Sequence, residues 1–546
     1  MPFGFEPCWP TGFLILSLAA AVAAAVAFIC IYFFYIDIPV IKGIPEIPGG
    51  RLLAGNLYQL GNDHATTLEE WSLGHKWPVF QIRMGRRRAV VLNSFDSSRE
   101  WLVKNQSATL DRPWLYTFHG VVSSTSAATI GTSPWNERTK KQRRIVGSLT
   151  TGPSVQKLGR MLDLETCAMI SGLYYDGQKG AVDIMPHIYQ KRVALNIMTM
   201  FCYGTRFSSI TNPLLLQILS DASTIASFRS TNSNPQDYIP HLRYLSSGAR
   251  ISTAVDVRSR RDQWLVAMLD KARQKLAVNN ASRRSVAELL LTDNQEGLTT
   301  LDIKTILGGL MSGGFETLFS TAIITIGLLS TPEGQSIQKK AYEDILTVYE
   351  TPEQAFELCV REEKSAYVAA IVKEALRFYP PLKLLPARQT YKDFEYHGAV
   401  IPKGVLLYIN AQAANRDKAT YGEDADQFRP ERWIDNPQNV PPPYHFAFGA
   451  GARMCTAVNF SNRVLYAMFL RLIVSYRITE SKTMPANTDY VQYKRDPAAS
   501  NAIASDFKVY FQPRDKGVLE SCFARSQENV VDLVSGEAVE VLRRKD

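Results

Sequence analysis

The chain lacks the cysteine pattern of a disulfide-stabilised or zinc-binding protein. Its seven cysteines are scattered over 546 residues, and no two of them form a C-x-x-C pair. This spacing indicates neither a disulfide framework nor a zinc ribbon. Because the number is odd, at least one thiol is left for another role.

Other features are missing as well, and each absence removes a class of protein. A mean hydropathy of -0.11 excludes a polytopic membrane protein. The net charge of +9 comes without a basic stripe interleaved with aromatic residues, so no nucleic-acid partner is expected. Beyond residue 51 there is no linker, repeat or low-complexity block. With 46% hydrophobic and 21% charged residues, the body is expected to fold as one globular domain.

One long apolar run lies near the N-terminus, where the 26 residues of 11–36 include no charged residue. At about 1.5 Å per residue, a helix of this length spans a hydrocarbon core of about 30 Å. A cleaved signal peptide is the alternative, but no Lys or Arg precedes the run. The first ones are Lys42 and Arg51, so the positive-inside rule predicts a cytosolic body. We predict a retained transmembrane anchor over 1–36 and a proline-rich hinge over 37–50.

The body is predicted to be mainly helical with a small sheet. Two hairpins are expected, one of 79–84 with 89–92 around Gly85 and one of 400–401 with 405–408. The catalytic body is placed at 51–515, and the polar tail at 516–546 is either a peripheral helix or disordered. Apolar periodicity predicts long helices around 158–204, 254–277, 299–330 and 356–378.

Cys455 lies in a glycine-containing segment just before an apolar run that is expected to be helical. The N-terminus of a helix and the nearby Arg453 both favour a thiolate. The segment therefore indicates an anionic metal ligand or a reactive thiol, with a buried structural cysteine as the alternative. It does not fit a dinucleotide-binding fingerprint, because Gly449 and Gly451 are not followed by a third glycine.

Glu374 and Arg377 are three residues apart at the end of a predicted helix, so they share one face. Pairs of this kind are usually exposed and contribute little to stability. The alternative is that both side chains turn inward and meet Arg432, which lies in a proline-rich stretch before Cys455.

The centre of the predicted helix 299–330 carries residues that weaken it, namely Gly313-Gly314-Phe315-Glu316-Thr317. A glycine costs a helix about 1 kcal/mol relative to alanine, and a buried glutamate adds a desolvation cost. Such a loss indicates a point where the backbone approaches a ligand and where Glu316 and Thr317 move protons. A close helix–helix contact, with the glutamate reaching solvent, is the alternative.

In order and spacing these three segments resemble the haem-thiolate monooxygenases, the cytochrome P450 family, and the resemblance extends from the anchor to Pro513. It implies a mainly α fold with haem between the long central helix and the cysteine loop. Phe448-x-x-Gly451-x-Arg453-x-Cys455 resembles the haem-binding loop, and 313–317 resembles the oxygen-activation segment. Glu374, Arg377 and Arg432 resemble the Glu-Arg-Arg triad. Segments 105–113 and 130–135 are similar to the fungal phenylacetate-hydroxylase branch.

The resemblance implies a role for each candidate residue. Cys455 would be the axial iron ligand, and Arg453, Trp135 and Arg388 would bind the haem propionates. The family commonly has a basic residue four positions after this tryptophan, where this chain has Thr139. We therefore assign Lys140 as the basic partner. The family glycine two positions after the cysteine is Ala457 here, a change that leaves ligation intact. Thr317 and Glu316 would be catalytic, through a hydrogen bond to dioxygen and through proton delivery.

The resemblance also implies partners. The sequence has no flavin or nicotinamide motif, so an NADPH-dependent flavoprotein reductase would supply the electrons. Five cations within 138–144 form either a solvated helix face or the docking surface for it: Arg138, Lys140, Lys141, Arg143 and Arg144. By analogy, the substrate pocket is expected to be mainly apolar and to be lined by 116–119, 310–315, 382–385 and 500–502.

We therefore predict a haem monooxygenase, anchored by one span in the endoplasmic reticulum with a cytosolic catalytic domain, which inserts one atom of dioxygen into a small hydrophobic or aromatic molecule. The first predicted role is a tailoring step in fungal secondary-metabolite biosynthesis. The alternative is ring hydroxylation of an aromatic acid in catabolism. A reductase-independent haem enzyme or a haem sensor would not need Glu316 and Thr317, and a hydrolase would need a partner for Cys455.

Overall fold

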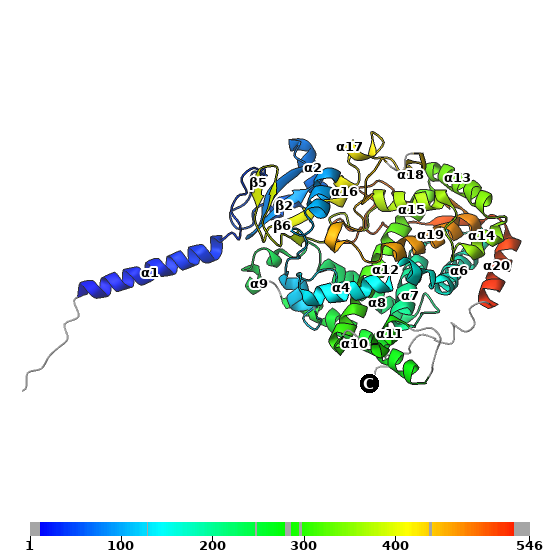
Figure 1. Ribbon diagram of the computed structural model, residues 1–546, viewed down its shortest axis with the longest axis horizontal. Helices are drawn as coiled ribbons and strands as arrows, with labels where there is room; N and C mark the ends of the chain where they lie inside the picture. The colour runs from blue at the N-terminus through cyan, green and yellow to red at the C-terminus, as the bar shows by residue number, and fades with distance from the viewer. Residues whose placement is uncertain are drawn as a thin grey trace, which may run out of the picture.

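The structure is a computed structural model that describes residues 11–127, 129–245, 248–278, 285–293, 297–435 and 439–528. Most of this chain is helical, with three small sheets, and the strands of residues 87–92, 399–401 and 406–409 lie on the left-hand side, next to the N-terminal helix (Figure 1). The predicted mainly helical fold with a small amount of β-sheet is therefore confirmed. The α-helices are α1 (Thr11–Phe34), α2 (His64–His75), α3 (Phe95–Arg99), α4 (Glu137–Leu149), α5 (Gly152–Gln156), α6 (Gly159–Asp176), α7 (His187–Tyr203), α8 (Pro213–Ser227), α9 (Leu242–Leu245), α10 (Gly248–Val278), α11 (Val286–Thr292), α12 (Thr300–Ser330), α13 (Pro332–Val348), α14 (Pro352–Leu358), α15 (Ala366–Phe378), α16 (Ala411–Ala414), α17 (Lys418–Tyr421), α18 (Arg432–Asp435), α19 (Val458–Ser475) and α20 (Lys516–Glu528).

The largest sheet has the strand order β1-β2-β6-β3. The first predicted hairpin is present, with a turn at Gly85, whose φ is +57°. The second is not. Ala399–Ile401 pairs instead with Phe394–Tyr396 through a two-residue turn at His397 and Gly398, both with positive φ, as that turn type requires. The strands are β1 (Val79–Met84), β2 (Arg87–Leu92), β3 (Arg388–Gln389), β4 (Phe394–Tyr396), β5 (Ala399–Ile401), β6 (Leu406–Ile409), β7 (Tyr476–Glu480) and β8 (Val509–Pro513).

Two of the predicted long helices are interrupted. The run 158–204 is broken between α6 and α7, where Gly177 ends the first helix and Gly180 has a φ of +88°. The run 356–378 is broken after α14, and α15 starts only at Ala366, where the Ser365 side chain caps it by accepting from the Val368 N–H. Apolar periodicity continues across both breaks, so it does not mark them.

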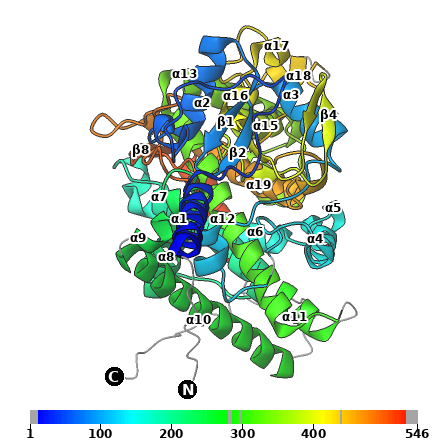
Figure 2. The same ribbon diagram turned by 90° about the vertical axis from the view of Figure 1, so that its left-hand side faces the viewer.

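The core lies where α12 crosses the helical part of the molecule (Figure 2). Its N-terminus has a capping box, in which Thr299 and Asp302 satisfy each other's backbone N–H groups. Its C-terminal half, from Leu318 to Ser330, is buried on all sides among α7, α13, α19 and β7. This packing holds α12 rigidly, so the residues at its centre have fixed positions.

The two ends of the described chain differ in their packing. Helix α1 projects away from the body, beside the sheet (Figure 1). Within the described part, Thr300–Ser330 is the one helix long and apolar enough to pass a test for a membrane span, but 72% of that window is buried in the protein. Ile15–Val26 is a shorter apolar helix. At the other end, α20 buries Leu519, Cys522 and Phe523, and the part of the predicted tail after 528 lies outside the described residues.

Candidate functional site

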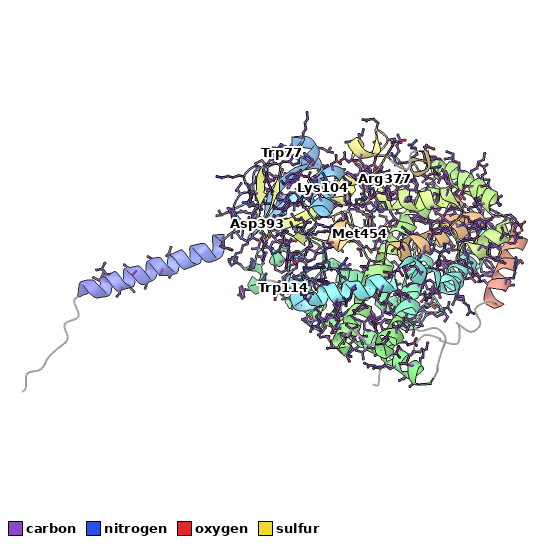
Figure 3. The ribbon with its side chains drawn as sticks, in the orientation of Figure 1. Trp77, Lys104, Trp114, Arg377, Asp393 and Met454 are labelled. Carbon is purple, nitrogen blue, oxygen red and sulfur yellow. The ribbon has the colours of Figure 1, made fainter. Side chains whose placement is uncertain are left out.

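A cavity of about 440 Å³ lies between the centre of α12 and the loop that carries Cys455. Its lining includes four residues predicted from the sequence: Thr317, Arg388, Arg453 and Cys455. The remaining lining is mainly apolar and comes from segments far apart in the chain. In Figure 3, Met454, the neighbour of Cys455, lies in the interior of the view above α4. The structure therefore brings the cysteine loop and the glycine-rich part of α12 to one cavity.

The Cys455 loop is held in shape by its own backbone and by two glycines. The Cys455 N–H donates to the Phe448 carbonyl at 2.9 Å, and Gly449 and Gly451 have φ of +67° and +62°. A Cβ at Gly451 would lie 1.7 Å from the Leu102 carbonyl oxygen, so only glycine fits there. The loop leads into α19, and the Ala457 N–H donates to Cys455 Sγ at 3.4 Å. Burial raises the pKa of this thiol, while the Ala457 N–H and Arg143 oppose that shift.

Four arginines line the cavity around this loop: Arg112, Arg143, Arg388 and Arg453. Each donates to backbone carbonyls, as Arg388 Nη2 does to Ala450 at 2.5 Å and Arg453 Nη2 to Ser133 at 3.0 Å. Burial and mutual repulsion lower the pKa of Arg388 and of Arg453 to about 9. The Nε atoms of Arg112 and Arg453 are buried without a hydrogen-bond partner in the described chain. Such a cluster is suited to an anionic ligand.

Arg112 and Arg143 line the cavity but were not predicted from the sequence to do so, whereas the predicted Lys140 does not line it. Lys140 was assigned as the basic partner on α4, but it is exposed, pairs with Glu137 at 3.6 Å and does not line the cavity. Arg143, one turn further along α4, lines it instead and donates to the Met454 carbonyl at 2.7 Å. Arg112 was noticed only as part of a branch resemblance. Apart from its position before Pro113, the sequence has no feature that identifies Arg112 as a residue of this cavity.

Trp135 lies behind the residues that line the cavity. Its backbone N–H donates to Asp111 Oδ1 at 2.6 Å, and the Arg453 guanidinium carbon lies 5.5 Å from the centre of its ring. It is not among the residues that line the cavity. In this structure Trp135 therefore supports Arg453.

The two glycines of α12 have different surroundings. A Cβ at Gly314 would lie 2.4 Å from Met198 Sδ, so this glycine allows α7 to pack closely. A Cβ at Gly313 would have no neighbour within 4 Å, because Gly313 faces the cavity. The close helix–helix contact of the alternative is therefore present at Gly314, but Glu316 is buried and does not reach solvent. The Thr317 hydroxyl donates to the Gly313 carbonyl at 2.8 Å, and its side chain borders the cavity.

Glu316 does not line the cavity. Its side chain is buried, and its Oε2 accepts from Asn501 Nδ2 at 2.6 Å and lies 3.7 Å from Arg229 Nη2. Burial raises the pKa of Glu316, while Arg229, Asn501 and Lys191 oppose the shift. Asn501 and Arg229 do line the cavity, so they separate this carboxylate from it.

Glu374, Arg377 and Arg432 form a buried cluster, as predicted by the alternative in which Glu374 and Arg377 turn inward. Arg377 donates to both oxygens of Glu374 at 2.6 and 2.9 Å, and Arg432 Nε lies 3.6 Å from the same carboxylate. Trp433 Nε1 donates to Glu374 at 2.9 Å as well. Arg377 also donates to the carbonyls of Asn415, Ala425 and Gln427, from the chain that leads to the Cys455 loop. None of the three lines the cavity, and Arg377 is labelled above Met454 in Figure 3.

The segments expected to line the substrate pocket mostly do so. Residues 382–385 and 500–502 line the cavity, as do Phe118, His119 and part of 310–315. Tyr116 does not, and its ring lies 4.5 Å from the Arg243 guanidinium carbon instead. His119 has backbone partners on both ring nitrogens, at Leu115 and Thr132, and burial lowers its pKa.

Haem fits the residues around Cys455. Haem has two carboxylates and an iron that accepts a thiolate ligand. The loop offers one thiol facing the cavity, and the four arginines beside it offer positive charge, with two buried nitrogens that have no partner in the described chain. Cys455 would hold the iron, while Arg112, Arg143, Arg388 and Arg453 would hold the propionates.

Comparison with known proteins agrees with this reading. The sequence model of the family "Cytochrome P450" matches residues 45–493. The chain is 37% identical over 520 residues to phenylacetate 2-hydroxylase of Emericella nidulans. The aligned region covers 95% of this chain and 99% of that protein. It is 33% identical to 3-hydroxyphenylacetate 6-hydroxylase of the same organism, over 90% and 94% of the two chains. A cytochrome P450 monooxygenase of Mycosarcoma maydis is 30% identical over 86% of each chain.

Proposed function

Since this chain belongs to the cytochrome P450 family, whose members are haem-thiolate monooxygenases, we propose that it hydroxylates a small aromatic acid of the arylacetate type. Two similar proteins, both matched over nearly their whole length, are named as hydroxylases of phenylacetate and 3-hydroxyphenylacetate. The mainly apolar cavity above Cys455 supports an aromatic substrate. A tailoring role in secondary-metabolite biosynthesis, the first role predicted from the sequence, stays a prediction.

The protein's part in the reaction is to bind, orient and supply protons. When bound, a haem held by the Cys455 thiolate would supply the oxygen-activating chemistry that incorporates one atom of dioxygen into the substrate. Thr317 presents its hydroxyl to the cavity from a rigid helix, and Gly313 leaves the space beside it open. We assign Thr317 to holding dioxygen by a hydrogen bond and Glu316 to supplying protons through Asn501 and water.

Electrons would come from an NADPH-dependent flavoprotein reductase that docks on the α4 side. Helix α4 is next to the Cys455 loop, because Arg143 contacts the Met454 carbonyl and Thr150, just after the helix, donates to the Thr456 carbonyl at 2.7 Å. Of the five cations in 138–144, Arg138 pairs with Asp302 at 2.6 Å and Arg143 faces the cavity. We assign the contact with an acidic partner to the exposed Lys140 and Arg144 and to Lys141 between them.

We also propose that α1 anchors the protein in the endoplasmic reticulum membrane, with the catalytic domain in the cytosol. The apolar composition of α1, its projection from the body (Figure 1) and the basic residues that follow it support this orientation. Deletion of residues 1–36 should shift the protein from the membrane fraction to the supernatant. Unchanged sedimentation with the membranes would contradict the assignment.

The activity is tested with the purified full-length enzyme, an NADPH-dependent reductase, phenylacetate and isotopically labelled dioxygen. The expected product is a ring-hydroxylated phenylacetate with one labelled oxygen atom per molecule, formed only when reductase and NADPH are present. Cys455→Ala is the matched control and should form none. A product without the label, or equal product without the reductase, would contradict the proposed function.

A further inference from the structure

Arg229 is a cationic side chain at the cavity that makes no hydrogen bond within the described chain. Arg229 follows α8 and lines the cavity with a side chain that is 24% exposed. Its Nε is buried without a partner, and its guanidinium donates no hydrogen bond to any residue in the described part of the chain. The nearest opposite charge is Glu316, at 3.7 Å from Nη2, which is too long for a hydrogen bond.

Most other cations at this cavity are held by the protein itself. The four arginines around Cys455 donate to backbone carbonyls, Arg261 donates to Asp262, and Lys494 pairs with Asp63. Lys304 is the exception in the described chain, since it too has no hydrogen bond. It lies thirteen residues before Thr317 on α12, which corresponds to about 20 Å along the helix. Arg229 instead stands beside Glu316, the neighbour of Thr317.

The surroundings of Arg229 fix its position and leave its donors available. The next residue, Ser230, donates to the Ala498 carbonyl at 2.5 Å, and Ser500 donates to the Ala226 carbonyl at 3.1 Å, so the two loops are tied together. Glu316 is satisfied by Asn501 and does not need Arg229 for a hydrogen bond. The Phe118 ring lies 5.9 Å from the Arg229 guanidinium carbon and also lines the cavity.

We propose that Arg229 binds the carboxylate of the substrate and determines the preference for an aromatic acid over its neutral analogue. The guanidinium fork matches a carboxylate with two parallel hydrogen bonds. An aromatic ring on that carboxylate would lie along Phe118 and the apolar lining, close to the Thr317 segment. This assignment rests on the proposed function and adds the residue that selects the substrate.

The test compares phenylacetate with phenylacetamide, which has the same shape without the charge. Their dissociation constants are measured by equilibrium dialysis on the haem-loaded full-length enzyme, with the substrate-induced change in the haem spectrum as a second readout. The wild type should bind phenylacetate more tightly. Arg229→Gln should weaken phenylacetate binding by about tenfold to a hundredfold, the value of a charged hydrogen-bond pair, and leave phenylacetamide binding nearly unchanged. Lys304→Gln is the matched control and should leave both affinities as they are.

Further variants separate binding from folding. Arg229→Gln leaves Glu316 without its counter-charge, so the double variant Arg229→Gln, Glu316→Gln removes both charges together. It should show the same loss of preference. Arg229→Lys should keep part of it, because the charge remains and the fork is lost. Equal affinity of the wild type for both ligands, or an equal loss of both in Arg229→Gln, would overturn the proposal. These affinities are independent of product formation, so a failure of the proposed hydroxylation would be seen separately.

Discussion

Glu316 and Thr317 are neighbours in α12, yet only Thr317 borders the cavity, while the Glu316 carboxylate accepts from Asn501 beside it. The two residues therefore cannot do the same work. Thr317 can contact a molecule in the cavity directly, and Glu316 reaches it only through Asn501, Arg229 or water. This division gives the two side chains separable effects on turnover.

Thr317→Ala should lower product formation more than NADPH consumption, because the hydroxyl that holds dioxygen is lost while electrons still arrive. The measurement is the ratio of hydroxylated product to NADPH oxidised, which should fall by at least about tenfold, because a positioned proton-transfer group contributes about 10²–10⁴-fold. Thr317→Ser keeps the hydroxyl and should retain most of the ratio. An unchanged ratio in Thr317→Ala would remove this residue from the mechanism.

Gly314→Ala should destabilise the protein by about 1 to 3 kcal/mol, the cost of overpacking a core contact. The clash is with Met198 Sδ on α7. Loss of the haem absorption band in urea is the measurement, and Met198→Ala in the same chain should restore part of the stability. Gly313→Ala is the matched control, since its Cβ meets no atom within 4 Å. Equal destabilisation by the two alanines would contradict the assignment of separate roles.

Arg377→Ala should prevent stable haem incorporation. It removes one partner of a fully buried ion pair and leaves Glu374 with only the longer contact to Arg432 as charge compensation, which costs about 3 to 5 kcal/mol. The ratio of haem to protein after purification measures the effect. Arg429→Ala, whose side chain is 42% exposed and pairs with Asp424, should be close to wild type. A haem-replete Arg377→Ala protein would show that the cluster does not support the Cys455 loop.

Reversing the charge at Lys140 and Lys141 should slow reduction of the haem by the reductase by about tenfold at low salt and flatten its salt dependence, because steering by opposite charge is lost. Stopped-flow reduction at several ionic strengths measures both. The haem spectrum should not change, since Lys140 is exposed and Lys141 does not line the cavity. An unaltered rate would contradict docking on α4.

The sequence predicted the parts of the site that lie within short segments. The Cys455 loop, the pair of Glu374 and Arg377, and residues 313–317 can each be read from local spacing. The sequence places Arg143 on α4, but the direction in which its side chain points depends on how that helix packs against the loop whose Met454 carbonyl it contacts. The approach of Arg229 and Asn501 to Glu316 joins residues far apart in the chain, and such a contact leaves no local pattern to read.

The second hairpin shows the same limit in the fold. Residues 400–401 and 405–408 both have strand composition, but β5 pairs with β4 and β6 runs parallel to β2, with Val90 opposite Leu407. The composition of a strand indicates that it is buried, but it does not indicate which other strand it pairs with. The break between β5 and β6 lies at Pro402, where the chain passes from one sheet to the other.

The central claim is that Cys455 is the thiolate ligand of a haem held in this cavity. The most direct test is the carbon-monoxide difference spectrum of the reduced full-length protein beside Cys455→Ala. The wild type should show a red-shifted Soret band that is absent from the variant. A wild-type protein with bound haem but without this band, or a variant that keeps it, would contradict the claim.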